Sequence, residues 1–122
     1  MSAANYTMEI EQGATFSLFM TLRDSEEEPI DLTGYTGRGQ MRELVESSTK
    51  YDFTVSFNED ATDGIMKILM PATLTTTLPV QPSNSYTRAK TAFCYDVELI
   101  KADGTILRVL QGIANVSPEV TR

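Results

Sequence analysis

The chain has 122 residues, with 10 basic and 17 acidic side chains and a net charge of −7. This length lies inside the usual single-domain range, so we predict one domain over residues 1–122 with one hydrophobic core. The negative charge repels phosphate backbones and anionic lipid headgroups, which argues against nucleic acid and membranes as partners. The longest apolar stretches, such as residues 65–70, are too short to span a bilayer.

Two features of the composition limit the chemistry. Histidine does not occur, which excludes Ser-His-Asp and Cys-His catalysis and the common histidine-containing zinc sites. Cys94 is the only cysteine, and its place between Phe93 and Tyr95 in an expected strand favours a structural cysteine that is buried or faces the wall of the fold. The N-terminus has neither the basic start nor the apolar run of a secretory signal, which predicts folding in a reducing compartment.

Two alternating segments near the N-terminus predict strands. Residues 6–11 alternate apolar with polar side chains, and residues 14–22 repeat the alternation with Phe19 as the exception. Gly13 separates the two segments. Residues 24–29 combine turn formers with clustered carboxylates, so we expect an exposed acidic loop that is a solvated bystander or a weak electrostatic guide.

The next segment, residues 30–35, predicts a turn. Asp31, Thr33 and Gly34 are residues that form turns through local side-chain hydrogen bonds and positive φ angles. We therefore expect a structural turn rather than a ligand site, with the Asp31 carboxylate accepting hydrogen bonds from the nearby backbone.

The middle of the chain predicts three further strands, which are residues 36–44, 52–57 and 65–70. Gly37 and Gly39 in the first of them mark a bulge or a close backbone approach. The link at residues 58–64 superficially resembles a calcium loop, but its glycine is misplaced and no glutamate follows at the required spacing. Residues 72–78 hold three consecutive threonines, which predict a single helical turn or an irregular link.

The C-terminal third predicts a long loop and a hairpin. Residues 80–90 lack periodicity and form the longest predicted loop. Residues 92–100 and 105–116 are expected to pair through a turn at residues 102–105. About seven strands then occur at fairly regular spacing, which predicts an all-β fold, an immunoglobulin-like sandwich of two sheets, although the strand count leaves a barrel open.

Two remaining motifs are better explained by structure than by catalysis. Gly37 and Gly39 lack the third glycine of the dinucleotide fingerprint and lie in an expected strand. Asp96 and Glu98 share one strand face, which we expect to be a solvated polar face rather than an acid–base pair. We therefore predict no catalytic residue, no cofactor and no metal.

The alternation also predicts the core. The inward positions of the expected strands should be mostly buried, and they are Phe16, Leu18, Met20, Phe53, Val55, Tyr95, Val97, Leu99 and Leu110.

Three stretches, in their order and spacing, carry a resemblance to a known family. They are IEQGATF at residues 10–16, IDLTGYT at residues 30–36 with residues 40–42 after it, and YDVEL at residues 95–99, leading through residues 103–104 and 111–112 to residues 116–122. Together they resemble small virion proteins of tailed bacteriophages and the related N-terminal domain of phage baseplate upper proteins. The resemblance spans nearly the whole chain, from residue 10 to residue 122.

The resemblance implies a non-enzymatic virion protein, made in the host cytoplasm, that holds tail, baseplate, neck or fibre components together. Its expected partners are other virion proteins in a symmetric assembly with several copies per particle. Two alternatives remain open, namely a capsid decoration protein and a host-surface or glycan-binding module. The loop that contains Tyr86 motivates the last alternative, although the chain has no tryptophan to stack on a sugar.

The predicted binding surface has two parts. In the long loop, Tyr86, Arg88 and Lys90 combine an aromatic anchor with positive charge, a combination that protein interfaces favour. The second part is the C-terminal tail, which follows the last strand and could extend onto a neighbouring subunit, and it comprises Pro118, Glu119, Val120, Thr121 and Arg122.

Overall fold

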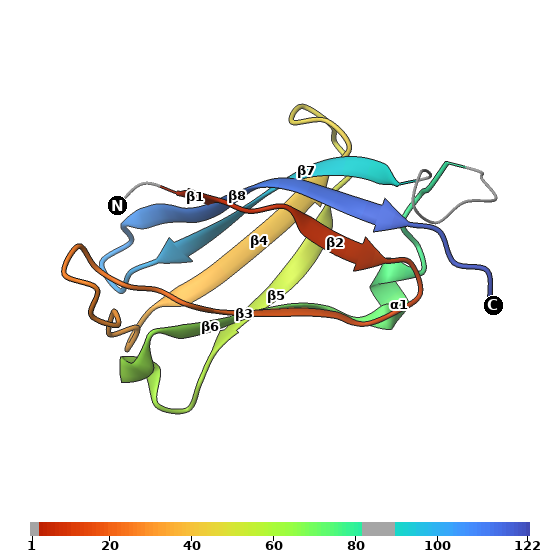
Figure 1. The fold of residues 1–122 in the computed structure, drawn as a ribbon. Helices are drawn as coiled ribbons and strands as arrows, with labels where there is room; N and C mark the ends of the chain where they lie inside the picture. The colour runs from red at the N-terminus through yellow and green to blue at the C-terminus, as the bar shows by residue number, and fades with distance from the viewer. Residues whose placement is uncertain (1–2, 82–89) are drawn as a thin grey trace.

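The computed structural model describes residues 3–81 and 90–122, and over them the protein is mostly β (Figure 1). The strands are β1 (Ala4–Asn5), β2 (Met8–Glu11), β3 (Phe16–Thr21), β4 (Thr36–Arg42), β5 (Tyr51–Phe57), β6 (Ile65–Met70), β7 (Thr91–Ile100) and β8 (Ile106–Ser117). Two short helices link them, the 3-10 helix η1 (Ala61–Asp63) and α1 (Ala72–Thr75). Neither of these helices is long and apolar enough to cross a membrane.

The strands form one mixed sheet of eight strands that curls into a half-barrel (Figure 1). The order is β1-β8-β7-β4-β5-β6-β3, and β2 also pairs with β8. Both β1 and β2 run parallel to β8, whereas the other ladders are antiparallel. The predicted immunoglobulin-like sandwich of two sheets is therefore wrong, because a single sheet connects all the strands.

Strand β5 is the reason that the sheet stays continuous. Its first half pairs with β4, with Tyr51 opposite Met41, and its second half pairs with β6, with Phe57 opposite Met66. The sheet bends where the strand changes partner. A side chain at Gly37 on β4 would collide with Val55 of β5, so the glycine permits the close approach at this bend, as the sequence suggested.

The inside of the curl holds the core, and the prediction that the inward set is mostly buried is confirmed. Five members are buried and four are half-buried, and none is exposed. The half-buried members are Phe16, Leu18, Met20 and Val55. Three of these four lie on β3, an edge strand that has a neighbour on one side only, which explains their greater exposure.

The predicted turn at Asp31 is also confirmed. The carboxylate Oδ1 accepts hydrogen bonds from the Thr33 backbone N at 3.0 Å and from Thr33 Oγ1 at 2.6 Å. These bonds favour the ionised form and lower the pKa of Asp31. Gly34 follows at a φ of +82°, a conformation that glycine adopts without strain. Likewise, α1 is the single helical turn expected in residues 72–78.

Candidate interaction surfaces

Strand β3 forms one edge of the sheet, and its backbone has an open side. The Leu22 N donates to the Gly64 O at 2.8 Å, so the even-numbered positions of this segment face β6. Because backbone groups alternate along an antiparallel strand, those of Ser17, Phe19 and Thr21 face away from β6. Within residues 3–81 and 90–122, no strand pairs with β3 on that side.

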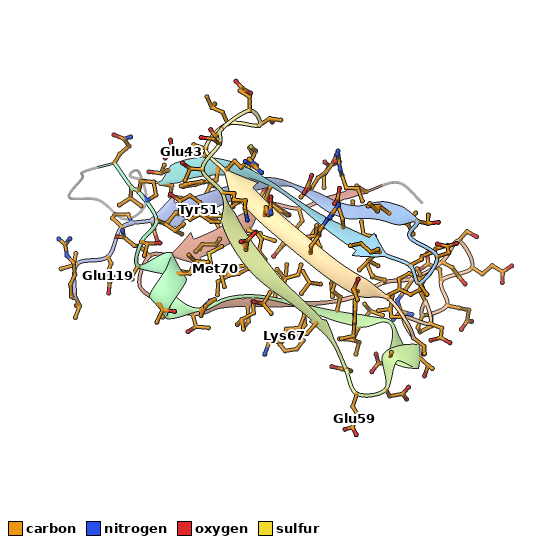
Figure 2. All side chains as sticks on the ribbon, turned by 180° about the vertical axis from the view of Figure 1, so that it is seen from behind. Glu43, Tyr51, Glu59, Lys67, Met70 and Glu119 are labelled. Carbon is orange, nitrogen blue, oxygen red and sulfur yellow. The ribbon has the colours of Figure 1, made fainter. Side chains whose placement is uncertain are left out.

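The side chains of this edge carry no charge. All six residues of β3 are uncharged, and Ser17, Phe19 and Thr21 are exposed. The Phe19 ring is 59% exposed, with Lys67 Nζ of β6 lying 5.5 Å from its centroid on the outer side (Figure 2). Edge strands that must not pair usually carry charges or proline. The β3 edge, by contrast, remains open to an added strand.

The opposite edge, formed by β1 and β2, has a different chemistry. Gln12 N donates to the Ser117 O at 3.0 Å, so the backbone of Glu9 and Glu11 faces away from β8 by alternation. Both glutamates are exposed, and Glu9 Oε1 lies 3.3 Å from Lys90 Nζ. Two carboxylates on four residues repel an approaching strand that is neutral or acidic.

The break between β1 and β2 is fixed by one hydroxyl and one glycine. The Tyr95 hydroxyl donates to the Tyr6 O at 2.6 Å, and burial raises the pKa of Tyr95 to about 12. Gly112 of β8 lies against the Tyr6 backbone, so closely that an added Cβ would collide with the Tyr6 O. Tyr95 and Gly112 therefore hold the Tyr6 backbone in place on the sheet.

The outer face of β4, β7 and β8 forms a groove of about 520 Å³, here called the arginine groove. Three guanidinium groups line it, together with two carboxylates, and these residues are Arg38, Arg42, Arg108, Asp96 and Glu98. Arg38 Nε lies 2.8 Å from Glu98 Oε1, and Arg108 Nε lies 3.6 Å from Asp96 Oδ2. The predicted solvated polar face is thus confirmed, with its carboxylates paired to arginines across the strands.

Cys94 also lines the arginine groove. It is half-buried on the outer face, and its Sγ lies 3.3 Å from the Arg42 O. The cysteine is therefore not buried, and its thiol lies against the backbone of β4.

The acidic loop between β3 and β4 is held in one conformation by its own hydrogen bonds. It comprises residues 23–29 and is here called the acidic tip. Asp24 Oδ1 accepts hydrogen bonds from the backbone N of Glu26 at 2.9 Å and of Glu28 at 3.0 Å. Arg23 Nη1 donates to the Glu27 O at 3.1 Å, and the bridge between Arg23 and Pro29 closes the base. The tip therefore presents its carboxylates on an ordered frame.

The hairpin between β4 and β5 projects from the end of the sheet, with Glu43 at its base (Figures 1 and 2). Its turn is closed by the Ser47 N donating to the Leu44 O at 3.0 Å. Leu44 is 62% exposed and Val45 is 80% exposed. The β4–β5 hairpin thus presents two apolar side chains to solvent.

The structure places part of the predicted binding surface at one end of the β7–β8 ladder. Thr91, next to Lys90, pairs with Val116, so Lys90 and the start of the C-terminal tail lie near one another. Pro118 and Glu119 are half-buried, and the Glu119 N donates to Gln12 Oε1 at 3.0 Å.

The remaining predicted residues divide into two groups. Three tail residues are exposed and therefore accessible to a partner, and they are Val120, Thr121 and Arg122. Their role in binding stays a prediction. Tyr86 and Arg88 lie outside the described residues.

Sequence reasoning missed two of these surfaces, the β3 edge and the arginine groove. The exception at Phe19 was the signal for the β3 edge, because an apolar side chain at an outward position has no core to fill. The arginine groove combines residues from three strands whose order the sequence did not reveal. The acidic tip was expected, but its ordered frame was not.

Comparison with known proteins gives no match to a family model and none to a curated protein. Within the part of the chain that the structure describes, no three or more metal-ligating side chains come together.

Proposed function

We propose that this protein is a non-enzymatic structural protein of a tailed-bacteriophage virion, where it joins tail, baseplate, neck or fibre components. The resemblance of residues 10–122 to small virion proteins supports this role. In the proposal the β3 edge receives an extended strand from a neighbouring virion protein, so that the half-barrel sheet continues across the contact.

The observation that carries the proposal is the uncharged, open edge of β3. Its outward backbone groups belong to Ser17, Phe19 and Thr21, which are exposed and neutral. Adding a strand to such an edge satisfies backbone donors and acceptors, and pockets for alternate side chains supply specificity. Phe19 gives the contact an aromatic side chain of a type that is enriched at the centre of protein interfaces.

The chain ends would supply a second contact. Val120, 71% exposed, and the residues after it continue beyond the part of the tail that Gln12 holds. In the assembled particle this tail and Lys90 would lie against a neighbour, as the sequence predicts.

The proposal is tested on purified virions produced from a genome that encodes this chain. Mass spectrometry should detect the chain in stoichiometric amounts, and cryo-electron microscopy should show repeated copies with a partner strand beside β3. Absence of the chain from purified particles would refute the virion assignment. Presence of the chain with β3 facing solvent would refute the role of the edge.

A further inference from the structure

The arginine groove concentrates positive charge in a protein that is otherwise acidic. It holds three of the 10 basic side chains on the outer face of three adjacent strands. Arg38, Arg42 and Arg108 together outnumber the two carboxylates of the groove, whereas the whole chain has a net charge of −7. The groove is therefore a place where an acidic partner is attracted rather than repelled.

Two of the three guanidinium groups of the groove keep N–H groups for a partner, whereas Arg42 donates to the Ser47 O and to Gln40 Oε1. Arg38 is bonded to Glu98 through Nε, and its side chain is 55% exposed. Arg108 is equally exposed, and its contact with Asp96 is longer, at 3.6 Å. Exposed ion pairs of this kind are weak and rearrange readily, so both arginines can bind a further carboxylate through their remaining N–H groups.

The acidic tip supplies three neighbouring carboxylates, the same number as the guanidinium groups of the groove. Glu26, Glu27 and Glu28 follow one another on its ordered frame, and all three are exposed. Glu27 has a φ of +66°, an unusual conformation for a residue other than glycine, asparagine or aspartate. In the described residues the groove arginines Arg38 and Arg108 form ion pairs with Glu98 and Asp96 and none with the glutamates of their own tip, so the tip that would bind a groove is that of a second copy.

We infer that the arginine groove of one copy binds the acidic tip of a second copy, so that copies join head to tail. A contact between two different surfaces of one chain leads to a ring or an open row rather than a closed dimer. The inference deepens the proposed assembly role, and it rests on that role for the premise that several copies meet in one particle.

The test is a reciprocal charge exchange on the purified full-length chain. One variant, Arg38→Glu with Arg108→Glu, reverses the groove, and the other, Glu26→Arg with Glu28→Arg, reverses the tip. Each variant then carries like charge on both surfaces and should not associate with itself. In an equimolar mixture each groove meets a tip of opposite charge, so association should return. Sedimentation velocity over a range of concentrations at low ionic strength measures all of these states.

Two controls separate the groove from general charge. The double variant Lys50→Glu with Lys101→Glu changes the net charge by the same amount as the groove variant and should associate like the wild type. Raising the salt to about 0.5 M should abolish association, because the Debye length then falls well below 10 Å. Circular dichroism verifies that each variant is folded.

The inference is overturned if the wild type stays monomeric at low ionic strength, or if either charge-reversed variant still self-associates. It is equally overturned if the folded variants do not associate when mixed. Any of these results leaves the virion assignment standing, because that assignment is decided by the composition and structure of purified particles.

Discussion

The two edges of the sheet have the same alternating pattern in sequence and opposite properties in the structure. On β2 the inward residues Met8 and Ile10 are 1% exposed, and the outward ones are glutamates. On β3 the inward residues are only half-buried, and the outward ones are neutral, including Phe19. On the β2 edge the inward side chains are fully buried and the outward carboxylates repel an added strand. The β3 edge has neither property, so it remains able to accept a strand.

One large expected effect concerns the backbone contact that holds β1 and β2 on the sheet. Gly112→Ala places a Cβ against the Tyr6 O at a φ of +152°, so the variant should lose about 2–4 kcal/mol of unfolding free energy. Gly104 is the matched control, because its φ of +91° is also positive but nothing lies within 4 Å of an added Cβ. Gly104→Ala should cost about 1 kcal/mol. Urea denaturation measures both, and equal losses would show that Gly112 does not anchor this edge.

Truncation of one inward side chain on each edge sharpens the comparison. Ile10→Ala on β2 should cost about 3–4 kcal/mol, because the side chain is fully buried. Leu18→Ala on β3 should cost about half as much in the isolated chain, because the side chain is half-buried. Urea denaturation of the two variants gives the values. If Leu18→Ala costs as much as Ile10→Ala, the β3 edge is as well sealed as the β2 edge.

Alkaline pH tests the hydroxyl that holds the Tyr6 backbone. The pKa of Tyr95 is raised to about 12 in the folded state, above its ordinary value of 10.0. The unfolded chain therefore loses this proton first, so the contribution of Tyr95 to stability is complete below pH 10 and declines as the pH rises toward 12. Tyr95→Phe should remove this part of the pH dependence in urea titrations. An unchanged alkaline profile in Tyr95→Phe would show that Tyr95 does not cause it.

The smallest expected effect on stability comes from the residue expected to matter most for assembly. Phe19→Glu places a carboxylate directly opposite Lys67, so the free energy of unfolding should change by no more than about 0.5 kcal/mol. The new charge on the open edge should nevertheless reduce incorporation into virions. Thr54→Glu, on the interior strand β5, is the matched control and should be incorporated normally. Quantitative mass spectrometry of virions compares the two, and equal incorporation would contradict the assembling role of β3.

Much of the fold follows from the sequence because alternation with a period of two identifies strands and their inward sides. The turn at Asp31 was predictable for a similar reason, since its hydrogen bonds join residues two apart. The two-sheet sandwich was a wrong prediction because alternation does not reveal strand partners. The change of partner within β5, which joins everything into one sheet, depends on contacts with β4 and β6 rather than on a local pattern.

The candidate surfaces were less predictable for the same physical reason. An exposed Phe19 is visible as an exception in the pattern, but only the sheet order places it at an edge. The three arginines of the groove come from β4 and β8 and are 70 positions apart at their extremes, from Arg38 to Arg108. The tail was predicted to bind because its sequence suggested no role in the fold, and the structure shows that Glu119 does contact its own domain.

The most direct measurement is amide hydrogen exchange of the two edges, compared between the isolated chain and purified virions. In the isolated chain, the outward amides of Ser17, Phe19 and Thr21 should exchange rapidly because no strand pairs with them in the described residues. In virions the peptide that covers Phe16–Thr21 should gain protection, while the peptide that covers Met8–Glu11 should change little. Protection of the β2 peptide alone, or no change in the β3 peptide, would contradict the account.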